Sequence, residues 1–203
     1  MLSQGGVFQK LPLASDGTTV ARIARFANDS YYLLRTPHSA WQKAALWFNL
    51  LHPSGRMLGF DIAYFDPPAL RHLYREIFVR QHYYFSADND SPVIFDCGAN
   101  VGVATFYFKW LYPKARVEAF EPDPNTFAVL ETNVARNRLT DVVAHNCAVW
   151  DENGQIEFFV DREHPGSLQM SADASRLKGA AIRVPSRKLS DFIQGPLTFS
   201  SWT

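Results

Sequence analysis

The residues best suited to chemistry in this 203-residue chain form a short motif, Asp-x-Gly-x-Asn-x-Gly. Its members are Asp96, Gly98, Asn100 and Gly102, and the apolar run 93–95 that precedes them predicts a buried strand. Glycine adopts positive φ and leaves room for a ligand beside the backbone. The amides at the start of the helix that follows would then face that ligand. The motif therefore predicts a small-molecule site at a turn between a strand and a helix.

A second acidic residue, Glu121, lies 25 positions after Asp96, at the predicted end of the next strand. A carboxylate at that place can accept hydrogen bonds from the 2′ and 3′ hydroxyls of a ribose. Asn146 follows the third predicted strand and could hydrogen-bond the edge of an adenine. The small side chains of Cys147 and Ala148 would let a flat ring lie close. Together these residues predict the site of a nucleoside cofactor.

The spacing favours S-adenosylmethionine over a dinucleotide. A dinucleotide site uses Gly-x-Gly-x-x-Gly and receives a pyrophosphate at the helix start, where Asp96 would repel that anion. S-adenosylmethionine has no phosphate and carries an ammonium and a sulfonium, so Asp96 becomes favourable, and a dehydrogenase is disfavoured. Asn100 offers donors and an acceptor to the methionine end of the cofactor or to the turn. The alternative is that Asp96 and Asn100 only satisfy turn backbone and that Glu121 is a solvated strand end.

No catalytic residue stands out by its type and spacing. The six histidines are scattered, and none has a carboxylate at a spacing that would pair with it. His164 and Ser167 lie in a loop expected to rise over the same end of the sheet, which makes them candidates for an acceptor pocket. Methyl transfer from a sulfonium to a hydroxyl needs alignment and a base, but no metal. We predict no metal site and leave the catalytic base unassigned.

The elements that must position these residues begin at Pro92, where strands and helices start to alternate. This alternation is typical of right-handed crossovers and a parallel sheet. An Asn153-Gly154 pair predicts a turn before a later strand. The expected strands are 93–96, 116–121, 141–146, 155–160 and 181–184, and the expected helices are 101–111 and 124–138.

Residues 1–90 show a different pattern and are expected to form an amino-terminal extension to a cofactor domain over residues 91–203. Gly5-Gly6 and Asp16-Gly17 predict turns or short strands near the start. A helix is expected from Ser39 to Leu51.

A further helix is expected to begin at Pro67-Pro68. Its apolar residues recur at helical spacing, which indicates a helix packed on a neighbour. The alternative is a surface for a substrate or partner. The stripe consists of Leu70, Leu73, Tyr74, Ile77 and Phe78.

The composition excludes several classes of partner. Lys plus Arg and Asp plus Glu both number 20, so nothing indicates binding to nucleic acid or to an anionic membrane. The longest apolar stretch, 44–51, is too short to span a bilayer, and no signal-peptide core is visible. Two cysteines without close spacing, Cys97 and Cys147, favour a reducing compartment. We therefore expect a cytoplasmic protein with a small-molecule partner, no nucleic-acid partner and no membrane partner.

Over about residues 75–193 the chain resembles the FkbM family of S-adenosylmethionine-dependent methyltransferases. The resemblance implies an α/β fold with a Rossmann-like class I methyltransferase sheet and a helical amino-terminal extension. It also implies methylation of a hydroxyl on a small molecule, such as a carbohydrate or a natural product. The cofactor-binding roles that it implies fall on Asp96, Gly98, Asn100, Gly102 and Glu121. The matching stretches are Ile94–Gly102, Ala119–Pro124, Asn133 with Asn137–Leu139, and Ala148–Val149 with Gly154.

The chain departs from the family pattern after Ile193. The family continues into a fourth central strand with a Lys-x-Asp-x-Glu-Gly pattern, whereas this chain reads Gln194–Thr203. We therefore expect a truncated, amino-terminal part of a methyltransferase, with a sheet that is incomplete at its carboxyl end. An open apolar edge promotes aggregation unless another chain covers it, so an oligomer is one expected outcome. The alternative function is a non-catalytic cofactor-binding fragment or pseudoenzyme.

Overall fold

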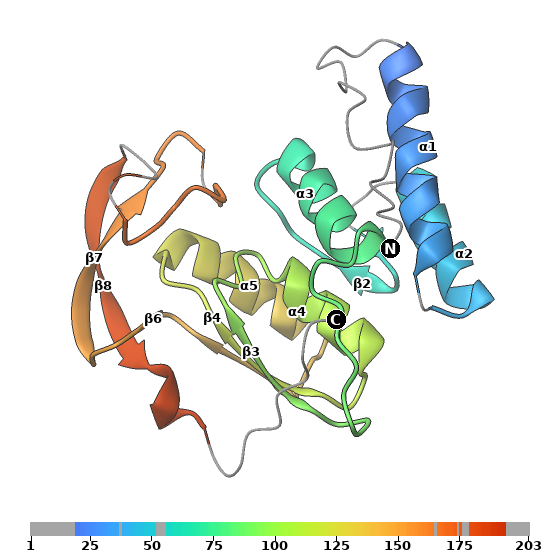
Figure 1. The fold of residues 1–203 in the computed structure, drawn as a ribbon. Helices are drawn as coiled ribbons and strands as arrows, with labels where there is room; N and C mark the ends of the chain where they lie inside the picture. The colour runs from blue at the N-terminus through green and yellow to red at the C-terminus, as the bar shows by residue number, and fades with distance from the viewer. Residues whose placement is uncertain are drawn as a thin grey trace, which may run out of the picture.

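The computed structural model of the protein describes residues 19–36, 38–51, 56–164, 166–173, 175 and 179–193 (Figure 1). Its helices are α1 (Thr19–Arg35), α2 (Ala40–Leu51), α3 (Pro67–Tyr74), α4 (Val103–Leu111) and α5 (Pro124–Arg136). A π-helical turn, Arg75–Val79, continues α3, and a 3-10 turn, Leu189–Asp191, follows the last strand. The strands are β1 (Arg56–Met57), β2 (Phe60–Asp61), β3 (Val93–Cys97), β4 (Arg116–Phe120), β5 (Val142–His145), β6 (Ala148–Trp150), β7 (Gly154–Val160) and β8 (Ala180–Lys188).

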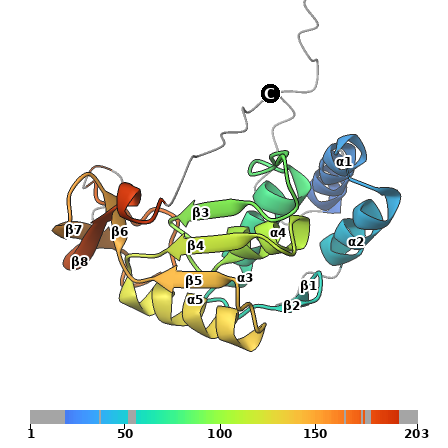
Figure 2. The same cartoon turned by 90° about the horizontal axis from the view of Figure 1, so that it is seen from below.

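The central sheet consists of β3, β4 and β5, which run parallel and lie in chain order (Figure 2). α4 connects β3 to β4, α5 connects β4 to β5, and both helices cover the same face of the sheet (Figure 1). Two right-handed crossovers produce this arrangement when the strand order follows the chain. The predicted α/β class and the parallel pairing of these three strands are confirmed.

The opposite face of the central sheet carries no helix within the described ranges (Figure 2). Val93 is 59% exposed and Val143 is 42% exposed, and the strand register puts both on this face. Among the described strands, β3 pairs with β4 alone, so its other edge is open. Parallel sheets are normally covered on both faces. Phe192 covers part of this face, where its ring packs against Phe120 and His145, while the face stays exposed at Val93 and Val143.

α5 begins where the sequence supplies a start signal. The Oδ2 atom of Asp123 accepts hydrogen bonds from the backbone N–H of Thr126 at 2.9 Å and from its hydroxyl at 2.7 Å. Pro124 occupies the first turn, where its missing N–H has no consequence. The helix then buries Leu130 completely, in one hydrophobic core with Phe106 of α4 and Val117 of β4.

The apolar stripe of α3 and the π-helical turn packs inward. Leu70, Tyr74, Ile77 and Phe78 are buried, and Leu73 is partly buried against the core. The Tyr74 hydroxyl donates to the backbone carbonyl of Leu46 in α2 at 2.9 Å. The prediction of a packed helix is confirmed, as is the helix expected between residues 39 and 51.

The sequence did not predict α1. No element was predicted for residues 19–35, where the structure has a helix of 17 residues. α1 is anchored by a buried ion pair, in which Arg75 Nε donates to Asp29 Oδ2 at 2.8 Å, and by the buried Leu33. Leu34 is 68% exposed and Ile23 is 63% exposed, so α1 also presents apolar side chains to solvent. The two glycine pairs that indicated turns lie outside the described residues.

Asn133 of α5 and Asn137, which directly follows the helix, fasten β2 and the segment after it to the central sheet region. The Asn133 side chain, fully buried, accepts a hydrogen bond from Ala63 N–H at 2.7 Å and donates to Ala63 O at 2.9 Å and to Val101 O at 2.8 Å. Asn137 pairs in the same two-way manner with the Asp61 backbone, at 2.8 Å in each direction. The predicted division near residue 90 stays a prediction, and these contacts cross it.

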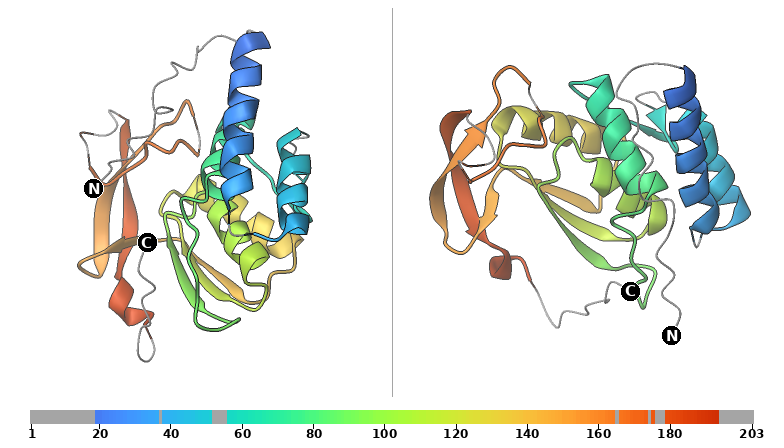
Figure 3. Two further views of the ribbon diagram at one scale, coloured as in Figure 1. Left: turned by 45° about the vertical axis from the view of Figure 1, so that its right-hand side comes forward. Right: turned by 45° about the horizontal axis from the view of Figure 1, so that its top comes forward.

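A second sheet has the order β6-β8-β7 and stands to one side of the first (Figure 3). β7 runs antiparallel to β8, from Gly154 opposite Ser186 to Val160 opposite Ala180, so the expectation of parallel pairing is wrong here. No described helix connects β7 to β8, and strands joined without a crossover pair antiparallel. The carboxyl ends of β3, β4 and β5 point toward this second sheet (Figure 2).

None of the helices in the described part of the chain is long and apolar enough to cross a membrane.

Candidate functional site

The turn between β3 and α4 folds the motif back onto the end of β4. Gly98, Asn100 and Gly102 all have left-handed backbone conformations, with φ of 88°, 52° and 96°. The N–H groups of Gly98 and Ala99 both donate to the carbonyl of Phe120 at 2.9 Å. The turn is therefore held at the carboxyl edge of the sheet.

The two glycines of this turn have different surroundings. A Cβ built at Gly98 would meet no atom within 4 Å, and Gly98 lines a cavity. A Cβ at Gly102 would lie 2.9 Å from Leu130 Cδ1 and 3.3 Å from Phe106 Cε2. Gly98 therefore leaves space for a ligand, whereas Gly102 allows α4 and α5 to pack closely.

Glu121 lies directly after β4 and is 5% exposed. One carboxylate oxygen accepts the Asn100 N–H at 2.9 Å, and the other accepts the Asp123 N–H at 3.0 Å. Burial raises the pKa of the Glu121 carboxyl to about 7, and the two amide hydrogen bonds only partly offset this effect. A carboxylate has about four acceptor positions, so each oxygen can accept one more hydrogen bond. The predicted alternative of a solvated strand end does not describe this buried group.

Asp96 points into the helix-covered face of the sheet. Its Oδ2 accepts the Thr105 hydroxyl of α4 at 2.6 Å, and the residue is 7% exposed. Burial raises the pKa of the Asp96 carboxyl to about 6, against the opposing effect of the Thr105 hydrogen bonds. Asp96 is not among the described residues that line the cavity. The carboxyl group of Asp96 therefore lies behind the turn, outside the lining of the cavity.

The Asn100 side chain makes two hydrogen bonds within the protein. Its Oδ1 accepts the Val101 N–H at 2.8 Å, and its Nδ2 donates to the carbonyl of Gly166 at 2.9 Å. The second bond joins the turn to a segment 66 residues later, and no sequence pattern predicted it.

Asn146 holds the segment after β4, because its Nδ2 donates to the carbonyls of Glu121 at 2.9 Å and Pro122 at 3.2 Å. It does not line the cavity, whereas the next two residues, Cys147 and Ala148, do. The proposed contact of Asn146 with an adenine edge stays a prediction.

The cavity has a volume of about 420 Å³ and is lined by residues from the carboxyl edge of the central sheet and from the second sheet. Sequence analysis predicted Cys147, Ala148 and Ser167 beside the site but not the walls from β7 and residues 168–172, because β7 reaches the site only through its pairing with β8. The lining residues are Cys97, Gly98, Asn100, Phe120, Glu121, Pro122, Cys147, Ala148, Val149, Trp150, Ile156, Phe158, Ser167, Leu168, Met170, Ser171 and Ala172.

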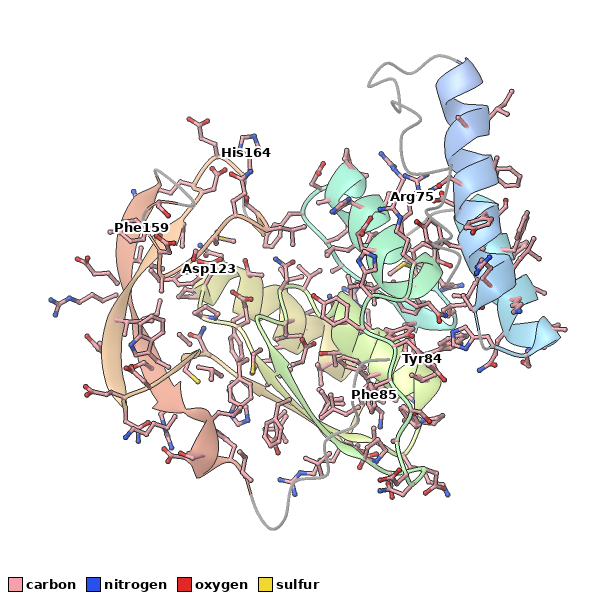
Figure 4. The ribbon with its side chains drawn as sticks, in the orientation of Figure 1. Arg75, Tyr84, Phe85, Asp123, Phe159 and His164 are labelled. Atoms are coloured by element: carbon pink, nitrogen blue, oxygen red, sulfur yellow. The ribbon has the colours of Figure 1, made fainter. Side chains whose placement is uncertain are left out.

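The two candidates for an acceptor pocket are separated by the structure. Ser167 lines the cavity. His164 is exposed, interacts through Nδ1 with Asp161 Oδ2 at 3.0 Å and points outward from the segment after β7 (Figure 4). Within the described residues, no three His, Cys, Asp or Glu side chains gather in a way that could hold a metal ion.

Comparison with known proteins agrees with this geometry. The profile of the methyltransferase FkbM domain matches residues 96–198, slightly more than half of the 203 residues. The chain belongs to the FkbM methyltransferase family. The match begins at the first residue of the motif and includes the turn, Glu121 and the second sheet, and the predicted family resemblance is confirmed.

Characterised relatives in this family are methyltransferases. The chain is 36% identical over 107 residues to the 31-O-demethyl-FK506 methyltransferase FkbM of Streptomyces tacrolimicus, covering 51% of this chain and 41% of that protein. It is 35% identical over 118 residues to the 2-O-methyltransferase NoeI of Sinorhizobium fredii, covering 55% and 44%. The chain thus spans less than half the length of these relatives.

A solved structure, the methyltransferase FkbM from Methylobacillus flagellatus, is 16% identical and overlaps 86% of this chain and 40% of its own, with a TM-score of 0.40. At that score the overlap is partial, and membership of the family follows from the sequence match.

Proposed function

We propose that this chain binds S-adenosylmethionine at the carboxyl edge of β3–β5 and transfers its methyl group to an acceptor. The observation that carries the proposal is the buried Glu121 carboxylate beside the bare Gly98 backbone, both on one cavity of about 420 Å³. Each Glu121 oxygen keeps a position for a ribose hydroxyl. Membership of the FkbM family supports the same cofactor.

The three parallel strands and their two helices support a Rossmann-like class I methyltransferase sheet. In that arrangement Gly98 lies beside the methionine end of the cofactor, Glu121 binds the ribose, and the cavity wall at Cys147 and Ala148 accepts the adenine. Asn146 positions the Glu121–Pro122 backbone through two hydrogen bonds, which supports a role beside the adenine.

The charges around the cavity support S-adenosylmethionine over a dinucleotide. Glu121 is the one charged side chain among the described lining residues, and no lysine or arginine is among them. A pyrophosphate would therefore meet a carboxylate without a cationic partner. The ammonium and sulfonium of S-adenosylmethionine are compatible with Glu121 and with the charge of Asp96 behind the turn.

When bound, S-adenosylmethionine supplies an electrophilic methyl group on its sulfonium. The chain's own residues orient the cofactor and exclude water from one side of it, and the acceptor must approach in line with the bond that breaks. Two relatives carry oxygen acceptors in their names, which supports a hydroxyl of a small molecule such as a carbohydrate or a natural product. No catalytic base is assigned, and His164 is exposed away from the cavity.

A second candidate function is cofactor binding without catalysis. It is favoured by one observation: no histidine lines the cavity among the described residues. The open face around Val93 and Val143 further supports a partner chain, which makes an oligomer part of the proposal. Light scattering in solution tests for this oligomer, because it measures the mass of the assembly. The cytoplasmic location stays a prediction.

Thermal unfolding with S-adenosylhomocysteine and with NAD tests the cofactor proposal. Stabilisation by S-adenosylhomocysteine alone is the expected result, because a ligand that binds only the folded state raises its stability. Stabilisation by NAD alone would refute the choice of cofactor. Incubation with S-adenosylmethionine and a panel of hydroxyl compounds, followed by mass spectrometry, then separates a methyltransferase from a protein that only binds the cofactor.

A further inference from the structure

Three segments distant in sequence meet at Gly166. Its carbonyl accepts the Asn100 Nδ2 at 2.9 Å, and a Cβ built on it would lie 2.6 Å from Cδ2 and 3.2 Å from Cε2 of the Phe65 ring. Asn100 belongs to the turn after β3, and Phe65 precedes α3. Gly166 itself is buried. The contact therefore joins the candidate cofactor turn, the amino-terminal elements and the segment after β7.

The conformation of Gly166 suits only glycine. Its φ is 74°, in the left-handed region, and the Phe65 ring occupies the space that a side chain would need. Asn100 also has a left-handed φ of 52°, which asparagine tolerates better than most residues. Both partners of the hydrogen bond are thus held in uncommon backbone conformations.

The segment that follows Gly166 forms one wall of the cavity. Ser167, Leu168, Met170 and Ser171 line it. The far end of this segment is fixed to β7, because Ser171 and Phe159 exchange backbone hydrogen bonds at 2.8 and 3.2 Å. The near end is fixed by the hydrogen bond from Asn100. The position of this wall therefore depends on two anchors, one of which is a residue of the cofactor turn.

We propose that Asn100 is a positioning residue: its side chain fixes the 166–172 segment as a wall of the cofactor cavity, with Gly166 and Phe65 completing the contact. The identity of the ligand rests on the proposed function. The proposal predicts that the cofactor turn and this wall move together, because the same residue holds Val101 N–H through Oδ1 and Gly166 through Nδ2.

Hydrogen exchange of the free protein tests the contact without any ligand. Asn100→Asp keeps an oxygen for Val101 N–H but removes the donor to Gly166, and Asn100→Gly removes both bonds while permitting the same φ. Both variants should exchange the amides of residues 167–171 about two- to tenfold faster than the wild type, the factor expected for one lost hydrogen bond. Unchanged exchange in both variants would overturn the proposal, and so would a change confined to Asn100→Gly.

A double-mutant cycle separates positioning from general loss of structure. Gly166→Ala should displace the segment, because its Cβ would overlap the Phe65 ring, and should weaken binding of S-adenosylhomocysteine about tenfold or more. Phe65→Ala removes the ring, so the double variant should recover a large part of that affinity. A double variant that binds no better than Gly166→Ala alone would contradict a contact between these two residues.

The two proposals fail in different ways. Wild-type protein that binds no S-adenosylhomocysteine would refute the proposed function, while exchange in the free protein would still decide the role of Asn100. Global unfolding midpoints in urea identify any variant whose faster exchange comes from loss of overall stability.

Discussion

Glu121 is a buried carboxyl group whose oxygens each hold one backbone amide. The amides belong to the turn after β3 and to the start of α5, so this side chain joins the ends of two elements as well as facing the cavity. Asp96 is likewise buried and joins β3 to α4 through Thr105. Burial raises the pKa of both carboxyl groups, so ionisation of either one opposes folding.

Cofactor binding should depend on pH through Glu121. Ribose hydroxyls bond an ionised carboxylate more strongly than a neutral acid, so binding lowers the pKa of Glu121 from about 7. Affinity for S-adenosylhomocysteine should be constant above pH 7 and should fall toward lower pH, with a limiting slope of about tenfold per pH unit. Calorimetry in buffers of different ionisation enthalpy measures both the affinity and the released proton. The matched variant Glu121→Gln should show weak binding that does not vary with pH, and affinity that rises toward low pH would be inconsistent with this role.

Asp96→Asn should stabilise the free protein at alkaline pH. The folded-state pKa of about 6 lies above the ordinary value of 3.8, so the folded state binds the proton more tightly and stability decreases as the pH rises between these values. Asparagine keeps an oxygen for the Thr105 hydroxyl but carries no charge. The free energy of unfolding in urea should exceed that of the wild type by about 1–3 kcal/mol at pH 8 and should converge with it near pH 4. A variant less stable than the wild type at pH 8 would contradict this account.

At the scale of elements, the sequence predicted the part of the fold that local signals determine. The glycine motif, the Asp123 cap with Pro124, and the apolar strands were sufficient for β3–α4–β4–α5–β5. α1 was missed because its anchor is the Asp29–Arg75 ion pair, whose partner lies 46 residues later. β8 was expected as a strand, but its insertion between β6 and β7 depends on pairing that no local pattern encodes.

Prediction of the candidate site from the sequence is limited in the same way, to what local signals determine. The glycine turn after β3 and the position of Glu121 after β4 were predictable from local sequence, while the Asn100–Gly166 bond spans 66 residues and had no local signal. The Asp96 carboxyl was predicted beside the ligand and is bonded to Thr105 instead, because alternation along β3 turns it toward α4.

The two glycines of the turn should respond differently to alanine. Gly102→Ala adds a Cβ 2.9 Å from Leu130 at a φ of 96°, so we expect a loss of stability of about 2–4 kcal/mol. Gly98→Ala adds a Cβ with no neighbour within 4 Å, and the left-handed backbone alone costs about 1–2 kcal/mol. That Cβ enters the cavity, so Gly98→Ala should weaken binding of S-adenosylhomocysteine more than its stability loss explains. Urea unfolding and calorimetry measure both effects, and equal stability losses would argue against the packing role of Gly102.

Asn133 of α5 and Asn137, which directly follows the helix, offer a matched pair of substitutions. Asn133→Ala leaves the buried Val101 carbonyl and the part-buried N–H and carbonyl of Ala63 without this partner, and should destabilise the protein by about 3–5 kcal/mol. Asn137→Ala removes hydrogen bonds to the exposed backbone of Asp61 and to the Asn133 carbonyl, which still accepts the Asn137 N–H, and should lose about 1 kcal/mol. Chemical denaturation measures the loss of stability in each of the two variants. Similar losses would indicate that Asn133 does not anchor the amino-terminal elements.

At the scale of the whole molecule, three regions meet around one cavity. The central sheet supplies the glycine turn and Glu121, the second sheet and residues 167–172 supply the facing wall, and the amino-terminal elements support that wall through Phe65. One continuous hydrophobic core runs from Leu33 of α1 to Val142 of β5. Separating these regions would therefore disturb the site as well as the fold.

Calorimetric titration of the wild type and of Glu121→Ala with S-adenosylhomocysteine tests the central claim most directly. The wild type should bind one equivalent, and Glu121→Ala should bind about 100-fold more weakly, because two hydrogen bonds to a charged group are lost. Near-ultraviolet circular dichroism verifies that the variant remains folded. Absence of binding by the wild type, or equal affinity in a folded Glu121→Ala variant, would contradict the assignment of this cavity to S-adenosylmethionine.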